Sequence, residues 1–214
     1  MEIKLKEVTK KLKGTTVIDH VTMELNSACV YGLCGYNGSG KTMLMRLIAG
    51  LIYPTSGTVT INGKVLGKEI DFPESIGLLL ENPAFLEEHT AFRNLLLLTE
   101  IRHTASERII RETLHRAGLD ANNPKPYQKY SLGMKQRLGI AAAIVEQPDL
   151  ILLDEPTNAL DTEGVDMLKT IIREERERGA LVVLASHDGE FLKSVSDRIC
   201  RVEKGHLKEW KELS

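Results

Sequence analysis

Hydrophobic and polar residues alternate along the first part of the chain with a period of two, which is typical of half-buried strands. Residues 3–5 and 21–25 follow this pattern. A third alternation at residues 59–61 leads into Asn62-Gly63, a dipeptide suited to a two-residue hairpin turn because both positions tolerate positive φ. The N-terminal part is therefore predicted to be antiparallel β-structure.

A different pattern interrupts these strands. Residues 30–34 form an apolar run that leads into a glycine-rich turn. Apolar residues then recur at helical spacing over residues 43–48, and Gly50 follows as a helix-ending residue. The order predicted here is strand, glycine-rich turn and helix.

Helical periodicity prevails from about residue 86 to residue 147. Within it, Ser106 is placed to cap a helix that Gly118 ends. Two fully apolar runs follow at residues 150–153 and 181–185, with a helical segment between them. Such runs, alternating with helices, favour a parallel sheet covered on both faces.

Together these patterns predict an α/β protein with a parallel-sheet core, an N-terminal antiparallel β subdomain and an inserted helical subdomain. We expect one domain over residues 1–214. Residues 1–85 and 148–214 would form the core with its β subdomain, and residues 86–147 the helical subdomain. A chain of 214 residues buries enough surface to need neither disulfides nor a metal for stability.

Composition narrows the classes of partner. The formal net charge of −2 removes the main electrostatic reason to expect nucleic acid as a partner. No apolar run approaches the ~18 to 20 residues that cross a bilayer, and no secretion signal is visible, so we expect a cytoplasmic protein without a membrane span. The cysteines Cys29, Cys34 and Cys200 include no CxxC pair and are expected to be reduced, without a zinc site or disulfide.

The glycine-rich turn fits the phosphate-loop motif G-x-x-x-x-G-K-[ST], between a predicted strand and a predicted helix. It consists of Gly35, Tyr36, Asn37, Gly38, Ser39, Gly40, Lys41 and Thr42. Its glycines let backbone N–H groups surround phosphates, and the helix N-terminus adds a favourable dipole. We expect Lys41 to contact the β- and γ-phosphates and Thr42 to ligate Mg²⁺. A fortuitous glycine-rich turn is the alternative, which the flanking elements disfavour.

The first of the two late apolar runs ends in two acidic residues, Asp154 and Glu155, before Pro156. Carboxylates at the carboxyl end of a parallel strand face the crevice where such sheets bind ligands. We expect Asp154 to hold Mg²⁺ and Glu155 to polarise a water for attack on the γ-phosphate. The alternative is that these acids only cap the following helix, which the need of a phosphate loop for a Mg²⁺ acid disfavours.

The segment at residues 130–137, YSLGMKQR, resembles the signature sequence of ATP-binding-cassette (ABC) transporter ATPase subunits. Its form is common among bacterial drug, bacteriocin and lantibiotic exporters and immunity systems. Ser131 and Gly133 open a helix whose free amides can bind a γ-phosphate. Residues 158–161 resemble the family's D-loop, and Ser186-His187 resembles its switch-histidine loop.

The resemblance implies a P-loop NTPase (RecA-like) core that binds ATP and Mg²⁺. It implies two cassettes with two ATP molecules between them, each contacted by the phosphate loop of one chain and the signature of the other, as a homodimer or with a paralogous cassette. His187 would donate to the γ-phosphate. Hydrolysis would power export through a separate integral-membrane permease, with the cassette at the inner face of the cell membrane.

Other classes are compatible with parts of the sequence. A nucleotide-sensing subunit would bind ATP with little hydrolysis. A non-transport ABC ATPase acting on nucleic acid would be expected to have tandem cassettes, long coiled coils or basic extensions, which this sequence lacks. A free-standing kinase leaves the signature segment unexplained.

Two positions depart from the family pattern. Leu12 stands where an aromatic residue usually stacks on adenine, so we expect weak discrimination between ATP and GTP. Glu81 stands where the family usually has Gln. A carboxylate there would bind Mg²⁺ more strongly than an amide, which would raise the rate, or would repel the nucleophile, which would lower it.

Residues 83–98 correspond to the segment on which the family docks its membrane subunit. Phe85, Leu86 and Phe92 are candidates to line that groove. Apolar residues at helical spacing are more often ordinary core, so burial in the helical subdomain is the alternative.

Overall fold

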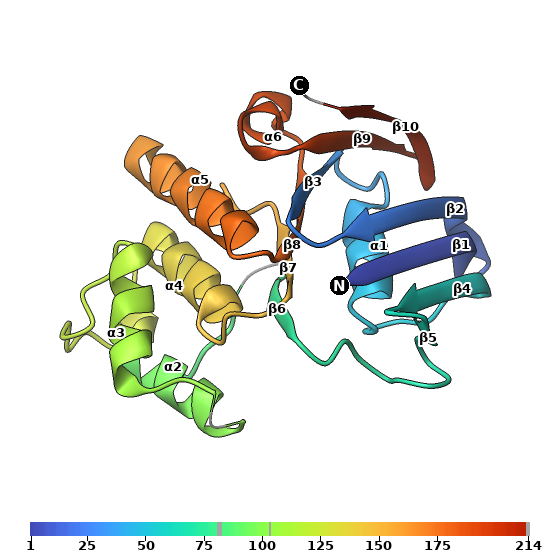
Figure 1. Cartoon of the computed structure of the whole chain (residues 1–214). Helices are drawn as coiled ribbons and strands as arrows, with labels where there is room; N and C mark the ends of the chain where they lie inside the picture. Colours follow the sequence, from blue (N-terminus) through green and yellow to red (C-terminus); the bar gives the residue numbers. More distant parts are fainter. Residues whose placement is uncertain (81–82, 103, 213–214) are drawn as a thin grey trace.

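The computed structural model describes residues 1–80, 83–102 and 104–212 (Figure 1). Within these residues the strands form a four-stranded sheet in the order β2-β1-β4-β5 and a six-stranded sheet in the order β10-β9-β3-β8-β7-β6. The strands of the first sheet are β1 (Glu2–Leu12), β2 (Thr15–Asn26), β4 (Ser56–Ile61) and β5 (Lys64–Val65). Those of the second are β3 (Cys29–Cys34), β6 (Ile76–Leu79), β7 (Leu150–Asp154), β8 (Leu181–Ser186), β9 (Arg198–Glu203) and β10 (His206–Glu212).

The smaller sheet is antiparallel, as the N-terminal alternation predicts. Ile3 and Leu5 are buried, and the residues between and after them face outward. The hairpin predicted at Asn62-Gly63 is confirmed, because Ile61 pairs with Lys64 across it and both turn residues have positive φ.

The larger sheet has a parallel core, in which β3, β6, β7, β8 and β9 run in the same direction and β10 pairs antiparallel with β9. The two apolar runs predicted as buried strands are β7 and β8, which are paired with each other and buried along their whole length. Their side chains alternate between the two faces of the sheet. Leu150 and Leu152 belong to one hydrophobic cluster, whereas Ile151 and Leu153 belong to another.

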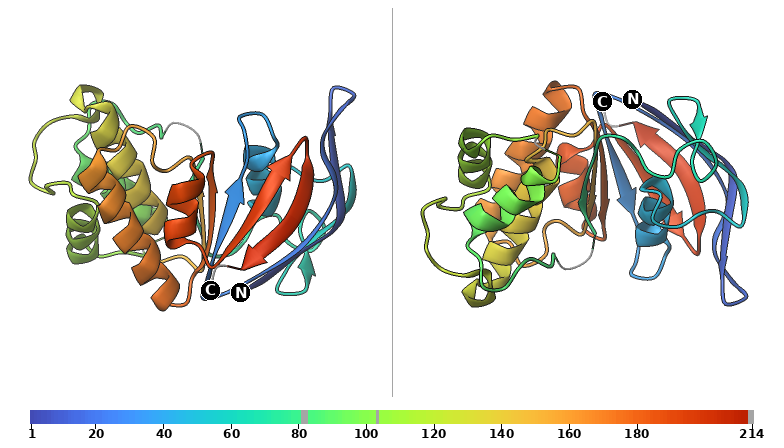
Figure 2. Two further views of the ribbon diagram at one scale, coloured as in Figure 1. Left: turned by 90° about the horizontal axis from the view of Figure 1, so that it is seen from above. Right: turned by 90° about the horizontal axis from the view of Figure 1, so that it is seen from below.

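Helices cover both faces of the larger sheet (Figure 2). The helix α1 (Lys41–Ile48) lies between the two sheets and packs its apolar side chains on both. The β subdomain and the core therefore share one hydrophobic cluster. The helices α5 (Thr162–Glu177) and α6 (Gly189–Val195) cover the opposite face together with part of α4 (Leu132–Ile144). The strand, turn and helix predicted around the phosphate loop are β3, the loop and α1.

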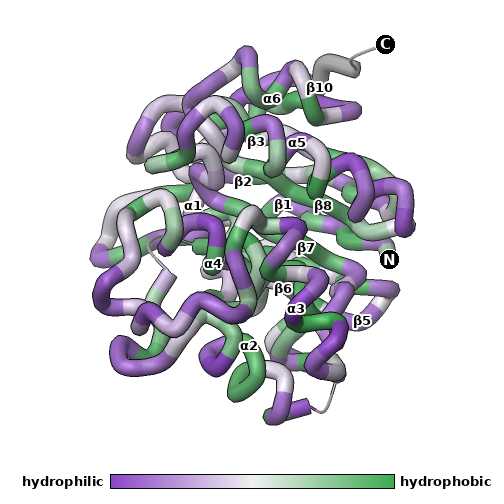
Figure 3. Tube along the Cα trace, turned by 90° about the vertical axis from the view of Figure 1, so that its left-hand side faces the viewer, coloured by the Kyte–Doolittle hydropathy of each residue, from purple (hydrophilic) through white to green (hydrophobic). Residues whose placement is uncertain are grey.

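The inserted segment contains α2 (Ala91–Glu100), α3 (Glu107–Arg116), the 3-10 helix η1 (Tyr127–Lys129) and the signature-bearing α4. These helices enclose a third hydrophobic cluster. The predicted cap of α3 is confirmed, because the Ser106 hydroxyl accepts the Ile109 N–H at 3.5 Å and Gly118 follows the helix with φ of 69°. Hydrophobic residues lie along β7 and β8, whereas hydrophilic and hydrophobic residues alternate around α3 (Figure 3).

Among the helices of the described ranges, none has the length and apolar character that spanning a membrane requires.

Candidate nucleotide-binding site

The phosphate-loop motif connects the end of β3 to the start of α1, at the carboxyl edge of the parallel strands. Gly40 has φ of 114°, a conformation that side-chain-bearing residues rarely adopt. A Cβ on Gly35 would lie 2.4 Å from the Val202 carbonyl oxygen, which leaves room only for glycine. The Ser39 carbonyl accepts the Gly205 N–H at 2.8 Å, so the β9–β10 turn supports the loop from outside.

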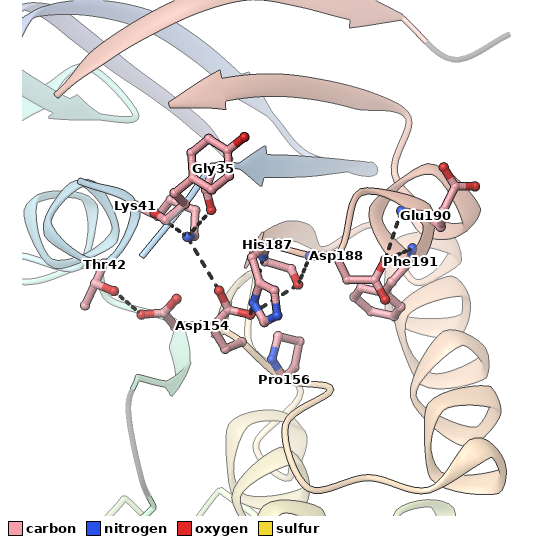
Figure 4. A network of polar contacts seen from close by, with 12 residues as sticks. Gly35, Lys41, Thr42, Asp154, Pro156, His187, Asp188, Glu190 and Phe191 are labelled. Carbon is pink, nitrogen blue, oxygen red and sulfur yellow. Dashed lines mark hydrogen bonds and ion pairs between the residues drawn. The ribbon is translucent and has the colours of Figure 1, made fainter. Parts of the chain in front are cut away.

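Lys41 is the first residue of α1, and its side chain is only 5% exposed. Its ammonium group donates to the carbonyl oxygens of Gly35 at 2.6 Å and Tyr36 at 3.3 Å, and lies 3.5 Å from Glu155 Oε1 (Figure 4). The positive charge is therefore held at the centre of the loop, in a position suited to a phosphate oxygen.

Thr42 and Asp154 meet across the edge of the sheet. The Thr42 hydroxyl donates to Asp154 Oδ2, and Asp154 is the last residue of β7 and is 7% exposed. A hydroxyl and a carboxylate are hard oxygen ligands, which fit Mg²⁺. The described residues contain no group of three or more His, Cys, Asp or Glu side chains that could hold a metal. Mg²⁺ is usually bound through one or two protein oxygens, with phosphates and water as its other ligands, and the Thr42–Asp154 pair fits this pattern.

Glu155 follows β7 with φ of 46°, a left-handed conformation that is uncommon outside glycine. Its N–H donates to the Ala185 carbonyl of β8 at 2.8 Å. Its Oε2 lies 2.9 Å from His187 Nδ1 and accepts from the Ser186 hydroxyl at 3.2 Å. The other oxygen, Oε1, is buried and has no hydrogen-bond partner among the described residues, and Lys41 is its cationic neighbour at 3.5 Å. The Glu155 carboxylate is thus held through Oε2, whereas Oε1 faces Lys41 of the phosphate loop.

The turn that carries His187 is fixed by its own hydrogen bonds. The Ser186 hydroxyl, which donates to Glu155, also accepts the Asp188 N–H at 3.1 Å. The Asp188 carboxylate caps α6 by accepting the N–H groups of Glu190 and Phe191, both at 3.0 Å (Figure 4). The imidazole of His187 remains 58% exposed, so it is accessible to a ligand.

The phosphate loop and the two acids, Asp154 and Glu155, surround a cavity of about 590 Å³. It is lined by Thr15, Thr16, Val17, Asn37, Gly38, Gly40, Lys41, Thr42, Met43, Asp154, Glu155, Lys204 and Gly205. Three residues of the motif, Gly35, Tyr36 and Ser39, do not line it. Ser39 is buried beneath the loop, and Tyr36, which is 73% exposed, lines a neighbouring cavity of about 410 Å³ together with His187.

The predicted signature residues lie elsewhere. Ser131 caps α4 by accepting the Met134 N–H at 3.2 Å, and Leu132 beside it is 74% exposed. Neither Ser131 nor Gly133 lines the cavity at the phosphate loop. A single chain therefore brings together the phosphate loop, the two acids and His187, but not the signature.

The predicted D-loop, residues 158–161, joins the Glu155 turn to α5. The Asp161 carboxylate caps this helix by accepting the Gly164 N–H at 2.8 Å. That hydrogen bond, together with the nearby Arg137 guanidinium, lowers the pKa of Asp161 below its usual value. The segment therefore ends at a charged N-cap of α5.

Comparison with known proteins identifies the family. Residues 18–158 match the family model described as ABC transporter. The chain belongs to the ABC transporter family. It is an ATP-binding subunit of such a transporter, as its sequence resemblance implies.

Several relatives match the cassette over nearly its whole length. YybJ of Bacillus subtilis (strain 168), an uncharacterized ABC transporter ATP-binding protein, is 46% identical over 96% of this chain and 94% of its own. The bacitracin transport ATP-binding protein BcrA of Enterococcus faecalis is 35% identical over 99% of this chain and 70% of its own. The lantibiotic transport ATP-binding protein SrtF of Streptococcus pyogenes is 32% identical over 96% of this chain and 88% of its own.

Solved structures match the fold of the cassette. A dimeric bacterial ABC transporter cassette has a TM-score of 0.88 and 26% identity, with 99% of both chains covered. A dimeric post-hydrolysis state of that cassette, bound to ADP and Pi, has a TM-score of 0.84 at 26% identity, again over 99% of both chains. The predicted fold class is confirmed: a parallel-sheet ATPase core with an antiparallel β subdomain and additional helices.

The two positions that depart from the family pattern, Leu12 and Glu81, differ in whether the structure describes them. Glu81, predicted as a possible Mg²⁺ ligand, lies outside the described residues. Leu12 ends β1, is 38% exposed and does not line the cavity.

The cavity has walls that the sequence analysis did not predict. They come from the first residues of β2, Thr15–Val17, and from the β9–β10 turn at Lys204-Gly205. The alternation of Cys200 and Val202 before a glycine was a hairpin signal that would have located this turn.

Proposed function

We propose that the cassette is a Mg²⁺-dependent ATPase that drives export through a separate membrane permease. One observation carries the proposal: Lys41, Thr42, Asp154 and Glu155 line a single cavity at the phosphate loop. The loop N–H groups and the Lys41 ammonium bind the β- and γ-phosphates.

Thr42 and Asp154 are the residues that would hold Mg²⁺, because their oxygens already lie in contact. The ion, when bound, supplies positive charge that neutralises phosphate oxygens. Glu81 is a further candidate ligand from the sequence.

Glu155 is the proposed general base. Its Oε2 is held by the Ser186 hydroxyl and the His187 ring. Its Oε1, which has no hydrogen-bond partner in the described part of the chain, is left to orient a water toward the γ-phosphate. His187 is proposed to donate to the same phosphate, because its ring is accessible and lies beside Glu155.

Hydrolysis is proposed to require two cassettes. Ser131 and Gly133 do not line the cavity of their own chain, and the exposed start of α4 offers its N–H groups to another molecule. A homodimer, or a dimer with a paralogous cassette, would supply a signature to each nucleotide. The solved relative is dimeric, which supports this arrangement.

We also propose that residues 86–147 form the helical subdomain and that residues 1–85 and 148–214 form the core, because α2, α3 and α4 enclose a separate cluster. A groove of about 360 Å³ lies where α4 meets β6 and is lined partly by Pro83, Phe85 and Leu98. We propose that a helix of the permease docks there, at the cytoplasmic face of the membrane.

The candidate docking residues differ in exposure. Leu86 is 55% exposed and is available to a partner. Phe85 and Phe92 are half-buried against the helical cluster, where Phe85 packs edge-on against Tyr127 with ring centroids 5.4 Å apart. Transport of bacitracin and lantibiotics by relatives supports export of a related class of peptide.

Phosphate release in steady state, compared between two variants, tests the proposal. Glu155→Gln keeps the phosphate contacts and removes the base, so hydrolysis falls by about 10² to 10⁴-fold while ATP binding persists. Lys41→Ala removes charge-assisted hydrogen bonds, so ATP affinity itself falls, by about 10- to 100-fold.

Two results would reject parts of the proposal. Near-normal hydrolysis by Glu155→Gln would remove Glu155 from the role of base. Absence of phosphate release by the wild-type cassette with its permease would favour a nucleotide sensor instead.

A further inference from the structure

The signature helix α4 contacts the segment that follows β7 at three points. A Cβ on Gly133 would lie 2.9 Å from the Ala159 carbonyl oxygen, so backbone meets backbone closely there. The Arg137 guanidinium lies 3.1 Å from Asp161 Oδ1. The third contact is made by Gln136 at the start of the segment, so all three contacts come from the N-terminal half of α4.

The side chain of Gln136 is buried, with 8% of its surface exposed. Its amide nitrogen donates to the Pro156 carbonyl oxygen at 3.0 Å and approaches the Glu155 carbonyl oxygen at 3.4 Å. Both partners are acceptors, so the NH₂ group, with its two donors, is the end of the amide that must face them. Gln136 thus bonds to the backbone of the turn that presents Glu155.

That turn needs support. Glu155 has φ of 46°, and a residue with a side chain keeps such a backbone only where surrounding contacts hold it. Two contacts come from the turn itself and from the sheet: the Asn158 N–H donates to the Glu155 carbonyl at 3.1 Å, and the Glu155 N–H donates to Ala185 of β8 at 2.8 Å. Gln136 adds the support that comes from α4.

We propose that Gln136 is a positioning residue, which holds the Glu155–Pro156 backbone so that the Glu155 carboxylate points to the phosphate loop. This inference rests on the proposed role of Glu155 as base. It also gives α4 a second role. The N-terminus of α4 is proposed to contact the nucleotide of the other cassette, and Gln136, one turn later, bonds to the catalytic turn of its own chain. Movement of α4 on closure therefore changes the placement of Glu155.

Single-turnover ATP hydrolysis by Gln136→Met tests the inference in two backgrounds. Methionine keeps the length of the side chain but has no donor, so the rate is expected to fall by about 10- to 100-fold, the effect of a small misplacement of a reacting group. The ATP dissociation constant stays at the wild-type value, because the phosphate contacts are intact. In the Glu155→Gln background the same substitution has no further effect, because the group it positions is already gone.

Gln136→Glu provides a second variant of the same size, in which the donating nitrogen becomes an oxygen, and it is expected to show the same loss. Gln128→Met is the matched control, because Gln128 is exposed and lies outside the site. Thermal unfolding and ATP binding verify that each protein is folded.

The outcomes distinguish a failure of the positioning role of Gln136 from a failure of the general-base role of Glu155. Wild-type rates in the folded Gln136 variants, with Glu155→Gln slow, would overturn the positioning role alone. Losses that multiply in the double variant would also overturn it, because they would show that Gln136 acts independently of Glu155. Near-normal hydrolysis by Glu155→Gln would instead reject the base on which the inference rests.

Discussion

At the scale of single residues, the chemistry of the site depends on side chains whose neighbours were not visible in the sequence. Lys41, Thr42, Asp154 and Glu155 were predicted from a local motif and from the end of an apolar strand. Their contacts depend on pairing of β7 with β8, which are far from the phosphate loop in sequence. The buried amide of Gln136 was not predicted, because a glutamine inside a helical pattern gives no sign of what it bonds to.

Discrimination between the adenine and guanine bases of ATP and GTP leads to one prediction at this scale. The described walls of the cavity include no aromatic side chain, and Leu12 does not line it. Phosphate contacts should therefore dominate affinity, and ATP and GTP should bind with dissociation constants that differ by less than about a hundredfold, or about 2.7 kcal/mol. Competition of both nucleotides against one fluorescent analogue measures this ratio, and a larger preference for ATP would contradict it.

Cys200 leads to a prediction about alkaline pH. Burial raises the pKa of its thiol from 9.0 to about 12. Between these values the unfolded chain releases a proton that the folded chain keeps, so this contribution to stability is complete below pH 9 and is lost as pH rises toward 12.

Urea unfolding at pH 8 and pH 10.5 tests this, with Cys200→Ala as the comparison. The variant is expected to be less stable at both pH values because of its cavity, but to lose less stability between them. An equal loss in both proteins would show that the Cys200 thiol does not contribute to the pH dependence.

At the scale of elements, periodicity located the N-terminal strands, α1, α3 and the buried pair β7 and β8. It did not identify β6, which is four residues long and contains Gly77, or the hairpin of β9 and β10. Short strands and edge strands are defined by the partners they pair with more than by their own pattern. The signature and D-loop were found by resemblance, whereas the contacts between them became visible only in the structure.

At Gly77 the backbone of β6 lies so close to that of α4 that a side chain does not fit. A Cβ there would lie 1.7 Å from the Ala143 carbonyl oxygen and 2.8 Å from Pro148 Cγ. Gly77→Ala must push α4 away from the sheet, so we expect it to destabilise the protein by about 1 to 3 kcal/mol or more.

The midpoint of urea unfolding measures this effect. Gly189→Ala is a suitable control, because a Cβ at Gly189 would have only Cys34 Sγ nearby, at 4.0 Å. Equal midpoints for the two variants would show that the close approach between β6 and α4 is not a constraint on stability.

At the scale of the whole molecule, the arrangement of α4 connects binding to hydrolysis. Its N-terminus is exposed, its C-terminal half packs on β6 and β7, and Gln136 bonds to the catalytic turn. A second cassette that binds nucleotide through Ser131 would therefore act on the same helix that supports Glu155. The groove between α4 and β6 places the proposed permease contact on this helix as well.

The central claim is that ATP is held between two cassettes, by the phosphate loop of one and the signature of the other. The most direct test is the molar mass of Glu155→Gln in solution, determined by light scattering with and without saturating ATP and Mg²⁺. Slow hydrolysis should trap the closed pair, so we predict a monomer without nucleotide and a dimer with it, and Ser131→Arg should prevent the change. A strictly monomeric protein at saturating ATP, both alone and together with its permease, would contradict the account.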